Sequence, residues 1–150
     1  MPQSLASVLI HLVYSTKHRH PFLPPDLDPE LYAYQAAVFA DMRCPAVIIN
    51  GTADHVHALF RLARTVTIAG VVEEVKKSSS KWLKTKRPTL AGFQWQVGYG
   101  AFSIGESGVP QTRAYIERQK EHHSDRSFQD EYRAILALYQ IEFDERYVWD

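Results

Sequence analysis

Two interleaved sets of apolar side chains run through the segment from Leu5 to Ser15. Successive residues of a strand point to opposite faces of a sheet, so a strand with one solvated face alternates between apolar and polar residues. Here both sets are apolar, with Val8, Ile10 and Leu12 in one and Leu9 and Val13 in the other. The segment therefore predicts a central strand in a sheet that is covered on both faces.

Hydrophobic periodicity and turn residues predict five further elements after this strand. They are a helix from Asp28 or Pro29 to about Met42, strands at Pro45 to Asn50 and His55 to Leu62, a helix at Ile68 to Lys86, and a strand at Trp95 to Ile104. The order β-α-β-β-α-β predicts an α+β fold of the ferredoxin-like, RRM-like split βαβ type, with a central antiparallel sheet. In that topology the first and third strands lie at the centre.

Two helices and a tail follow this core. Pro110 suits the first turn of a helix that runs to about His123, and a second helix is expected from Phe128 to Tyr139. A chain of 150 residues with 45% hydrophobic content fits one domain. We expect a core at about 5–104, a first C-terminal helix at about 109–123, and a last helix and tail at about 128–150.

The cysteine count and the hydropathy of the chain indicate its cellular compartment. Cys44 is the only cysteine, so no internal disulfide and no cysteine-based zinc site can form. No segment is apolar enough for a membrane span, and the first residues lack the layout of a signal peptide. These features predict a cytoplasmic protein with no membrane partner.

The charges are unevenly distributed although the formal net charge is zero. Residues 1–124 carry 14 Lys/Arg against 10 Asp/Glu, whereas residues 125–150 carry 3 against 7. Six basic residues crowd into one stretch: Lys76, Lys77, Lys81, Lys84, Lys86 and Arg87. This stretch is either a solvated helix face or a surface for a polyanion, and composition alone does not decide between them.

His55-Val56-His57 places two imidazoles on the same face of the third strand. Two neutral imidazole nitrogens supply half of a divalent-metal site. The pattern is weak by itself, because a His-x-His arises readily by chance in a chain with seven histidines. His18-Arg19-His20 has the same spacing, but its charged centre and the following proline suit a loop.

Tyr115 and Gln119 stand four residues apart and therefore share one face of the predicted helix. Tyrosine and glutamine are also ordinary surface residues. Together with two strand histidines, however, they have a chemical logic. A metal held by two imidazoles and an amide oxygen polarises a phosphate oxygen, and a phenolate attacks phosphorus to give a covalent phosphotyrosine and a free 3′-hydroxyl.

Several separated blocks of the chain resemble the single-tyrosine HUH transposases of the insertion-sequence 200/605 type, including their REP-associated relatives. The blocks begin at His11, Asn50, Lys77, Phe93 and Tyr115, and they read HLVYSTK, NGTADHVH, KSSS, FQWQVGYGAFS and YIERQKEHH. The resemblance implies a DNA transposase that cleaves and transfers single-stranded DNA at hairpin ends through a 5′-phosphotyrosine. A domesticated or inactive hairpin-binding protein of the same fold is the alternative.

The resemblance also implies roles for individual residues. Tyr115 would be the nucleophile, and His55, His57 and Gln119 would bind Mg²⁺ or Mn²⁺. A homodimer is implied in which the tyrosine helix of one subunit completes the active site of the other. Gly105 and Gly108 suit such an exchange as a hinge, although an ordinary loop is an equal interpretation. The zero net charge departs from the basic character expected of such a protein.

The remaining candidates concern DNA contacts and the surroundings of the histidines. We expect phosphate contacts from six basic side chains: Lys17, Arg19, Lys76, Lys77, Lys81 and Lys84. Asp54 either orients a ligand histidine or closes the turn, and a buried, hydrogen-bonded core position is expected for His11. A two-histidine phosphoesterase of another family is disfavoured, since it needs two separate His-x-Ser/Thr repeats and none pairs with His55-Val56-His57.

Overall fold

The computed structural model describes residues 2–123 and 125–150, and it confirms the split βαβ order. Its elements are β1 (Leu9–Ser15), α1 (Asp28–Asp41), β2 (Ala46–Gly51), β3 (His55–Arg61), α2 (Ile68–Lys84), β4 (Gly100–Ile104), α3 (Val109–Glu117), α4 (Gln119–His122) and α5 (Phe128–Leu138). The four strands form one antiparallel sheet in the order β2-β3-β1-β4. β1 and β3 are therefore central, as the sequence predicts.

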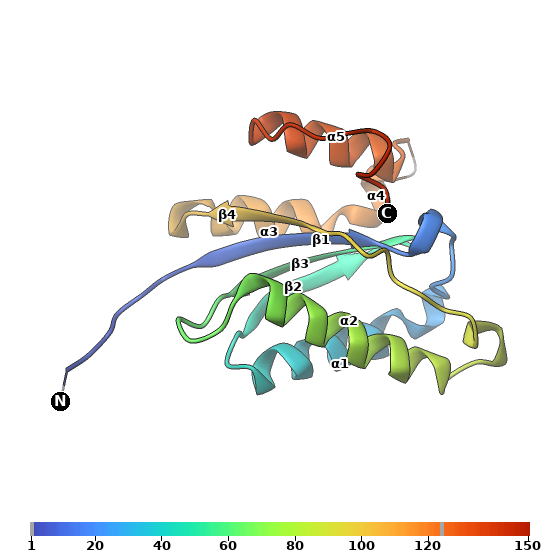
Figure 1. Cartoon of the computed structure of the whole chain (residues 1–150), viewed down its shortest axis with the longest axis horizontal. Helices are drawn as coiled ribbons and strands as arrows, with labels where there is room; N and C mark the ends of the chain where they lie inside the picture. Colours follow the sequence, from blue (N-terminus) through green and yellow to red (C-terminus); the bar gives the residue numbers. More distant parts are fainter. Residues whose placement is uncertain (1, 124) are drawn as a thin grey trace.

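Helices cover both faces of the sheet. Figure 1 shows α1 and α2 below it and α5 above it. The lower face is apolar, with Leu12, Val56 and Phe60 in the larger core cluster. The upper face carries two small apolar clusters, one around Leu9 and Leu59 and one around Phe102. Polar side chains lie on this upper face, and they form the candidate site. No helix of residues 2–123 and 125–150 is long and apolar enough to cross a membrane.

β1 is fully buried but shorter than its apolar pattern suggests. The pattern extends to Leu5, whereas the strand begins at Leu9. The ladders with both neighbours end there, because Leu9 pairs with Arg61 of β3 and with Ile104 of β4. Figure 1 shows the N-terminal segment running away from the sheet, and Leu5 is 86% exposed. The predicted beginning of this strand is therefore wrong by four residues.

The fourth strand is shorter than the predicted segment from Trp95 to Ile104. Its last pair with β1 joins Gly100 to Val13, and Trp95 makes only an isolated bridge. The loop between them is fixed by Lys76, whose ammonium donates to the carbonyl oxygens of residues 96, 97 and 98. Trp95 itself packs edge-on against Tyr14 in the core, and its indole N–H donates to a buried serine hydroxyl.

The helix expected at about 109–123 is interrupted at Arg118, which separates α3 from α4. Asn50 explains the break. Its Nδ2 donates to the carbonyl oxygens of Ile116 and Glu117, at 2.9 and 3.2 Å, where the helix would otherwise continue. These bonds satisfy the orphan carbonyls of a helix C-terminus. They also tie α3 to β2 of the same chain.

Candidate metal and nucleophile site

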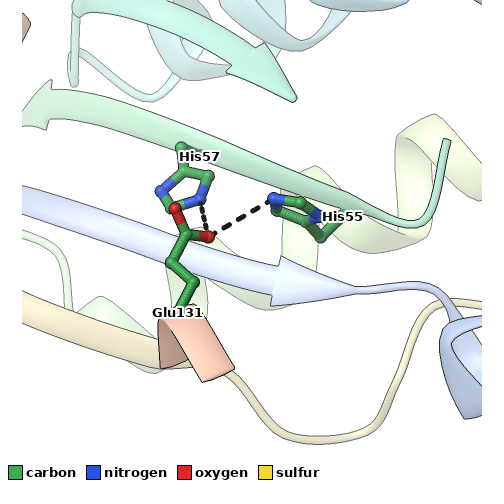
Figure 2. A group of neighbouring side chains, drawn as sticks. All are labelled: His55, His57 and Glu131. Carbon is green, nitrogen blue, oxygen red and sulfur yellow. Dashed lines mark hydrogen bonds and ion pairs between the residues drawn. The ribbon is translucent and has the colours of Figure 1, made fainter. Parts of the chain in front are cut away.

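His55 and His57 lie on β3 with their side chains on the upper face of the sheet, and both are fully buried. Figure 2 shows the two rings side by side under the strand. The Nδ1 atom of each ring has a partner. His55 Nδ1 donates to Asp54 Oδ1 over 2.7 Å, and His57 Nδ1 lies 2.8 Å from Nε2 of His11. Both Nε2 atoms are thereby directed to the same centre.

His11 and Asp54 thus act on the site through the histidines. His11 is buried and hydrogen-bonded, as expected, and it occupies the same face of the sheet as the two ligand candidates. Asp54 fulfils both roles considered for it. It orients His55, and it also accepts a hydrogen bond from Thr52 within the turn between β2 and β3.

Glu131 is the third side chain at this centre, and it is not among the residues predicted from the sequence. It comes from α5, and Figure 2 shows its carboxylate between the two rings. Its Oε1 lies 2.9 Å from His57 Nε2 and 3.5 Å from His55 Nε2. His55, His57 and Glu131 form a buried group of potential metal ligands, with all ligand atoms within 4.8 Å of one another.

A sequence signal for Glu131 does exist. It lies among the buried positions of an amphipathic helix, with Phe128, Tyr132 and Leu136. A charged side chain on an apolar face is expensive to bury unless it has partners or binds a metal. No spacing pattern connects it to the histidines, because they are more than 70 positions apart in the chain.

Gln119 and Tyr115 both reach the same centre. Gln119 is fully buried, and its Oε1 lies 3.0 Å from His55 Nε2. Its Nε2 donates to Oε2 of Glu131 over 2.8 Å. The Tyr115 hydroxyl donates a short hydrogen bond to the same carboxylate oxygen. The structure therefore brings the four predicted catalytic and metal-binding residues together within one chain.

His123 is a further member of this group. Its Nε2 lies 3.0 Å from Glu131 Oε1, and its ring centroid is 4.4 Å from that of His55. Burial opposes its charge, but the Glu131 carboxylate raises the pKa of His123 above its usual value. His123 therefore serves as an anchor for the carboxylate.

The protonation states favour cation binding. Burial lowers the pKa of His57 to about 4, so its ring is neutral near pH 7. Burial and the neighbouring His57 lower the pKa of His11 to about 3. Burial alone would raise the pKa of Glu131, but hydrogen bonds from His123, His57 and Tyr115 hold it far below its usual range. The neutral His57 ring thus faces a carboxylate.

The donor atoms fit a divalent cation. Because Asp54 can only accept at His55 Nδ1, the ring keeps a proton there, and Nε2 is the atom available to a metal. This Nε2 faces two oxygens, Gln119 Oε1 at 3.0 Å and Glu131 Oε1 at 3.5 Å. Adjacent ligands of an octahedral ion with bonds of about 2.1 Å lie about 3 Å apart. A cation at this centre would be coordinated by this nitrogen and by both oxygens.

The six expected DNA contacts do not lie beside this centre. Lys77, Lys81 and Lys84 are exposed on α2, which covers the opposite face of the sheet, and Lys17 is exposed after β1. Lys76 instead points into the loop at 96–98, and burial lowers its pKa to about 8. The Arg19 guanidinium lies over the ring of Trp149, 5.5 Å from its centroid.

Comparison with known proteins assigns the family. A model described as "Transposase IS200 like" matches residues 4–119 of the chain. The chain belongs to the IS200-like transposase family. The matched segment includes His55, His57, Tyr115 and Gln119, and it ends before α5 and Glu131. The resemblance recognised in the sequence is therefore confirmed at the level of the family.

Two solved structures share the fold of this IS200-like transposase. One is a putative transposase from Deinococcus radiodurans R1, with 23% identity and a TM-score of 0.61 over 79% of this chain and 98% of that one. The other is a REP-associated tyrosine transposase solved with a REP hairpin, with 13% identity and a TM-score of 0.55 over 79% of this chain and 68% of that one. No curated protein matches the chain.

Proposed function

We propose that this IS200-like transposase cleaves and rejoins single-stranded DNA through a covalent 5′-phosphotyrosine at Tyr115. The observation that carries the proposal is that one carboxylate, that of Glu131, contacts both the proposed nucleophile and a proposed metal ligand. Oε2 of Glu131 accepts from the Tyr115 hydroxyl, while Oε1 lies 2.9 Å from His57 Nε2. A phosphodiester held by a metal at the histidines would therefore lie next to the tyrosine oxygen.

The metal would be held by His55, His57 and Glu131, with Gln119 as a fourth ligand, and Mg²⁺ or Mn²⁺ suits this oxygen and imidazole set. When bound, such an ion supplies Lewis-acid polarisation of a phosphate oxygen. The chain itself sets the ligand orientation through His11 and Asp54. Outer partners of this kind fix the tautomer and the direction of a ligand ring.

The Tyr115 phenol must lose its proton as it attacks. Burial and the neighbouring Glu131 carboxylate raise its pKa above the usual value, so the hydroxyl is protonated at neutral pH. Glu131 Oε2 is its hydrogen-bond acceptor and orients the oxygen toward the site, and the proton passes to water as the oxygen attacks. The tyrosine oxygen then bonds to phosphorus, the bond from phosphorus to O3′ breaks, and the departing oxygen takes up a proton from water.

Reversal of these steps joins a new 3′-hydroxyl to the phosphorus and releases Tyr115. Because the phosphotyrosine retains the phosphodiester, no nucleotide hydrolysis is needed. We propose hairpin ends of an insertion element, or a REP-like palindrome, as the DNA. Support comes from the related transposase that was solved with a REP hairpin. The exposed side chains of Lys17, Lys77, Lys81 and Lys84 are the proposed backbone contacts, with Arg19 and Lys76 held by contacts within the chain.

A homodimer with exchanged tyrosine helices is the arrangement expected from the resemblance. A single chain already assembles Tyr115, both histidines, Gln119 and Glu131. Exchange is therefore not required to complete the site, and the dimer stays a prediction.

Replacing the nucleophile tests the proposed function. Tyr115→Phe deletes one oxygen, so the variant should bind a labelled hairpin as wild type does and form no covalent adduct with it. Tyr99→Phe is the matched control, because Tyr99 is half-exposed at the loop before β4 and its removal should leave the adduct intact. An adduct that persists in Tyr115→Phe would show that another residue is the nucleophile. Hairpin binding by wild type without any adduct would favour a binding protein.

A further inference from the structure

A cavity of about 350 Å³ opens directly beside Tyr115, between α3 and α5. Its inner end is lined by His11, Tyr115 and Glu131, which belong to the proposed catalytic centre. The cavity continues outward from these groups along the two helices. Whatever is covalently attached to the reacting phosphate must lie next to this opening, because the phosphate itself must reach the Tyr115 hydroxyl.

The outer part of the cavity has a mostly apolar wall. Ile104, Ala134, Ile135 and Leu138 supply it, and Leu138 is 77% exposed despite its apolar side chain. Tyr139 adds an aromatic ring that is fixed in place. Its hydroxyl donates to the Ser103 carbonyl oxygen over 3.1 Å, and its ring packs against a buried phenylalanine of β4. Rigid apolar and aromatic walls are suited to the faces of a planar base.

Two polar side chains converge on the same cavity from α3. Gln111 and Thr112 line it, and no side-chain hydrogen bond to either comes from a described residue. An amide and a hydroxyl both donate and accept, so they can pair with the edge of a base. Arg126 completes the wall from the other side and lies close enough to Tyr115 to lower its pKa, against the larger effects that raise it. Its guanidinium provides the positive charge that a phosphate flanking the base requires.

A single unpaired nucleotide is the occupant that these features fit. The volume is at the lower end for small-molecule sites, which suits one nucleotide. The α5 wall also lies outside the part of the chain that matches the family model, which ends at residue 119. The apolar wall for the base would therefore come mostly from the C-terminal helix, whereas the polar groups that read its edge come from α3.

We propose that the cleft between α3 and α5 binds the unpaired base next to the cleaved bond and selects its identity, which rests on the proposed strand-transfer function. The base would lie against Ile135 and Tyr139, with its edge toward Gln111 and Thr112 and its phosphate between Arg126 and Tyr115. Thr112→Val keeps the shape of the side chain and removes the hydroxyl. Ala134→Phe fills the cleft with a ring.

The test uses the full chain, Mn²⁺ and a pool of randomised single-stranded oligonucleotides. Covalent adducts are retained after denaturing washes, and both the attached and the released DNA are sequenced. Wild type should enrich one base at one position flanking the cleaved bond. Thr112→Val and Gln111→Ala should relax that enrichment alone, and Ala134→Phe should lower adduct yield by about tenfold or more. An abasic site at that position should have a similar effect on wild type.

Ala137→Phe is the matched control, because it adds the same side chain to α5 at a position outside the cavity. Ala137 is exposed on α5 and does not line the cavity, so its variant should retain wild-type yield and enrichment. Equal yields for the two phenylalanine variants, together with an unchanged base preference in Thr112→Val, would overturn the proposed base site and leave strand transfer intact. A pool that gives wild type no more adduct than Tyr115→Phe would overturn both proposals.

Discussion

Glu131 connects the two halves of the catalytic centre at the scale of a single residue. One oxygen faces the histidines and the other accepts from Tyr115 and Gln119. Glu131→Gln preserves the size of the side chain but removes its negative charge. Since a hard divalent cation binds a carboxylate more strongly than an amide, we expect Mn²⁺ affinity to fall by at least about tenfold, measured by calorimetry.

Asp130→Asn is the control for this substitution. The neighbouring carboxylate faces solvent and pairs with Arg133, so its loss should leave Mn²⁺ affinity unchanged. Equal Mn²⁺ affinities for the Glu131 and Asp130 variants would remove Glu131 from the metal site. In that case His55, His57 and Gln119 would remain the ligand set, as the sequence resemblance implies.

Individual residues of the site differ in how far sequence predicts them. His55 and His57 are readable because alternation along a strand fixes their common face. Tyr115 and Gln119 are readable as a pair on one helix face. Glu131 and His123 are not, because their positions depend on how α5 docks on the sheet, and no local periodicity encodes that packing. The burial of Lys76 is hidden for the same reason, since a loop 20 positions later supplies its acceptors.

The hairpin between β2 and β3 determines the position of the first histidine at the scale of elements. Gly51 ends β2, and a Cβ atom built there would lie 2.2 Å from the carbonyl oxygen of His55. Backbone would have to move to relieve this contact. Gly51→Ala should therefore lower the free energy of unfolding by about 1–3 kcal/mol and weaken Mn²⁺ binding, measured by urea unfolding and calorimetry.

Gly105→Ala provides the contrast. Nothing lies within 4 Å of a Cβ built at Gly105, and its φ of −73° is ordinary for any residue. Its variant should match wild type in both measurements. Gly51→Ala with wild-type stability and Mn²⁺ affinity would show that the hairpin tolerates a side chain, and that the turn does not fix His55.

The sequence predicts the end of an element correctly where the hydrophobic periodicity stops at that end. The prediction is wrong where contacts with distant segments end the element early. α1 and α2 begin and end close to the predicted residues. β1 loses the apolar residues before Leu9 because neither neighbouring strand extends to them. The break at Arg118 arises from Asn50, which is distant in sequence and caps α3. Patterns within one segment carry no information about such partners.

The whole molecule separates its basic surface from its catalytic face. α2 carries Lys77, Lys81 and Lys84 below the sheet, whereas the metal site and α5 lie above it, as Figure 1 shows for the helices. The acidic C-terminal segment predicted from charge counts is the segment that contains α5 and Glu131. A DNA strand bound along α2 would have to pass an edge of the sheet to reach Tyr115.

At the same scale, α3 with Tyr115 can dock either on its own chain or on a partner subunit. The segment before α3 is attached to its own sheet, because Glu106 pairs with Arg61 of β3 and accepts a hydrogen bond from Ser7. Ile116 of α3 is buried in the cluster with Leu9 and Leu59. Exchange of α3 between subunits would break these contacts in one chain and rebuild them in another.

Mixing two inactive variants distinguishes the two routes. Tyr115→Phe keeps the histidines and His57→Ala keeps the tyrosine, so a site shared between chains would regain one intact copy in each heterodimer. The intrachain contacts of Glu106, Asn50 and Ile116 predict the opposite result, in which every site retains one defect and no adduct forms. The measurement is adduct yield after unfolding and refolding the mixture, which allows any dimer to exchange subunits. Restored cleavage would refute the intrachain site and support the shared homodimer that the family resemblance implies.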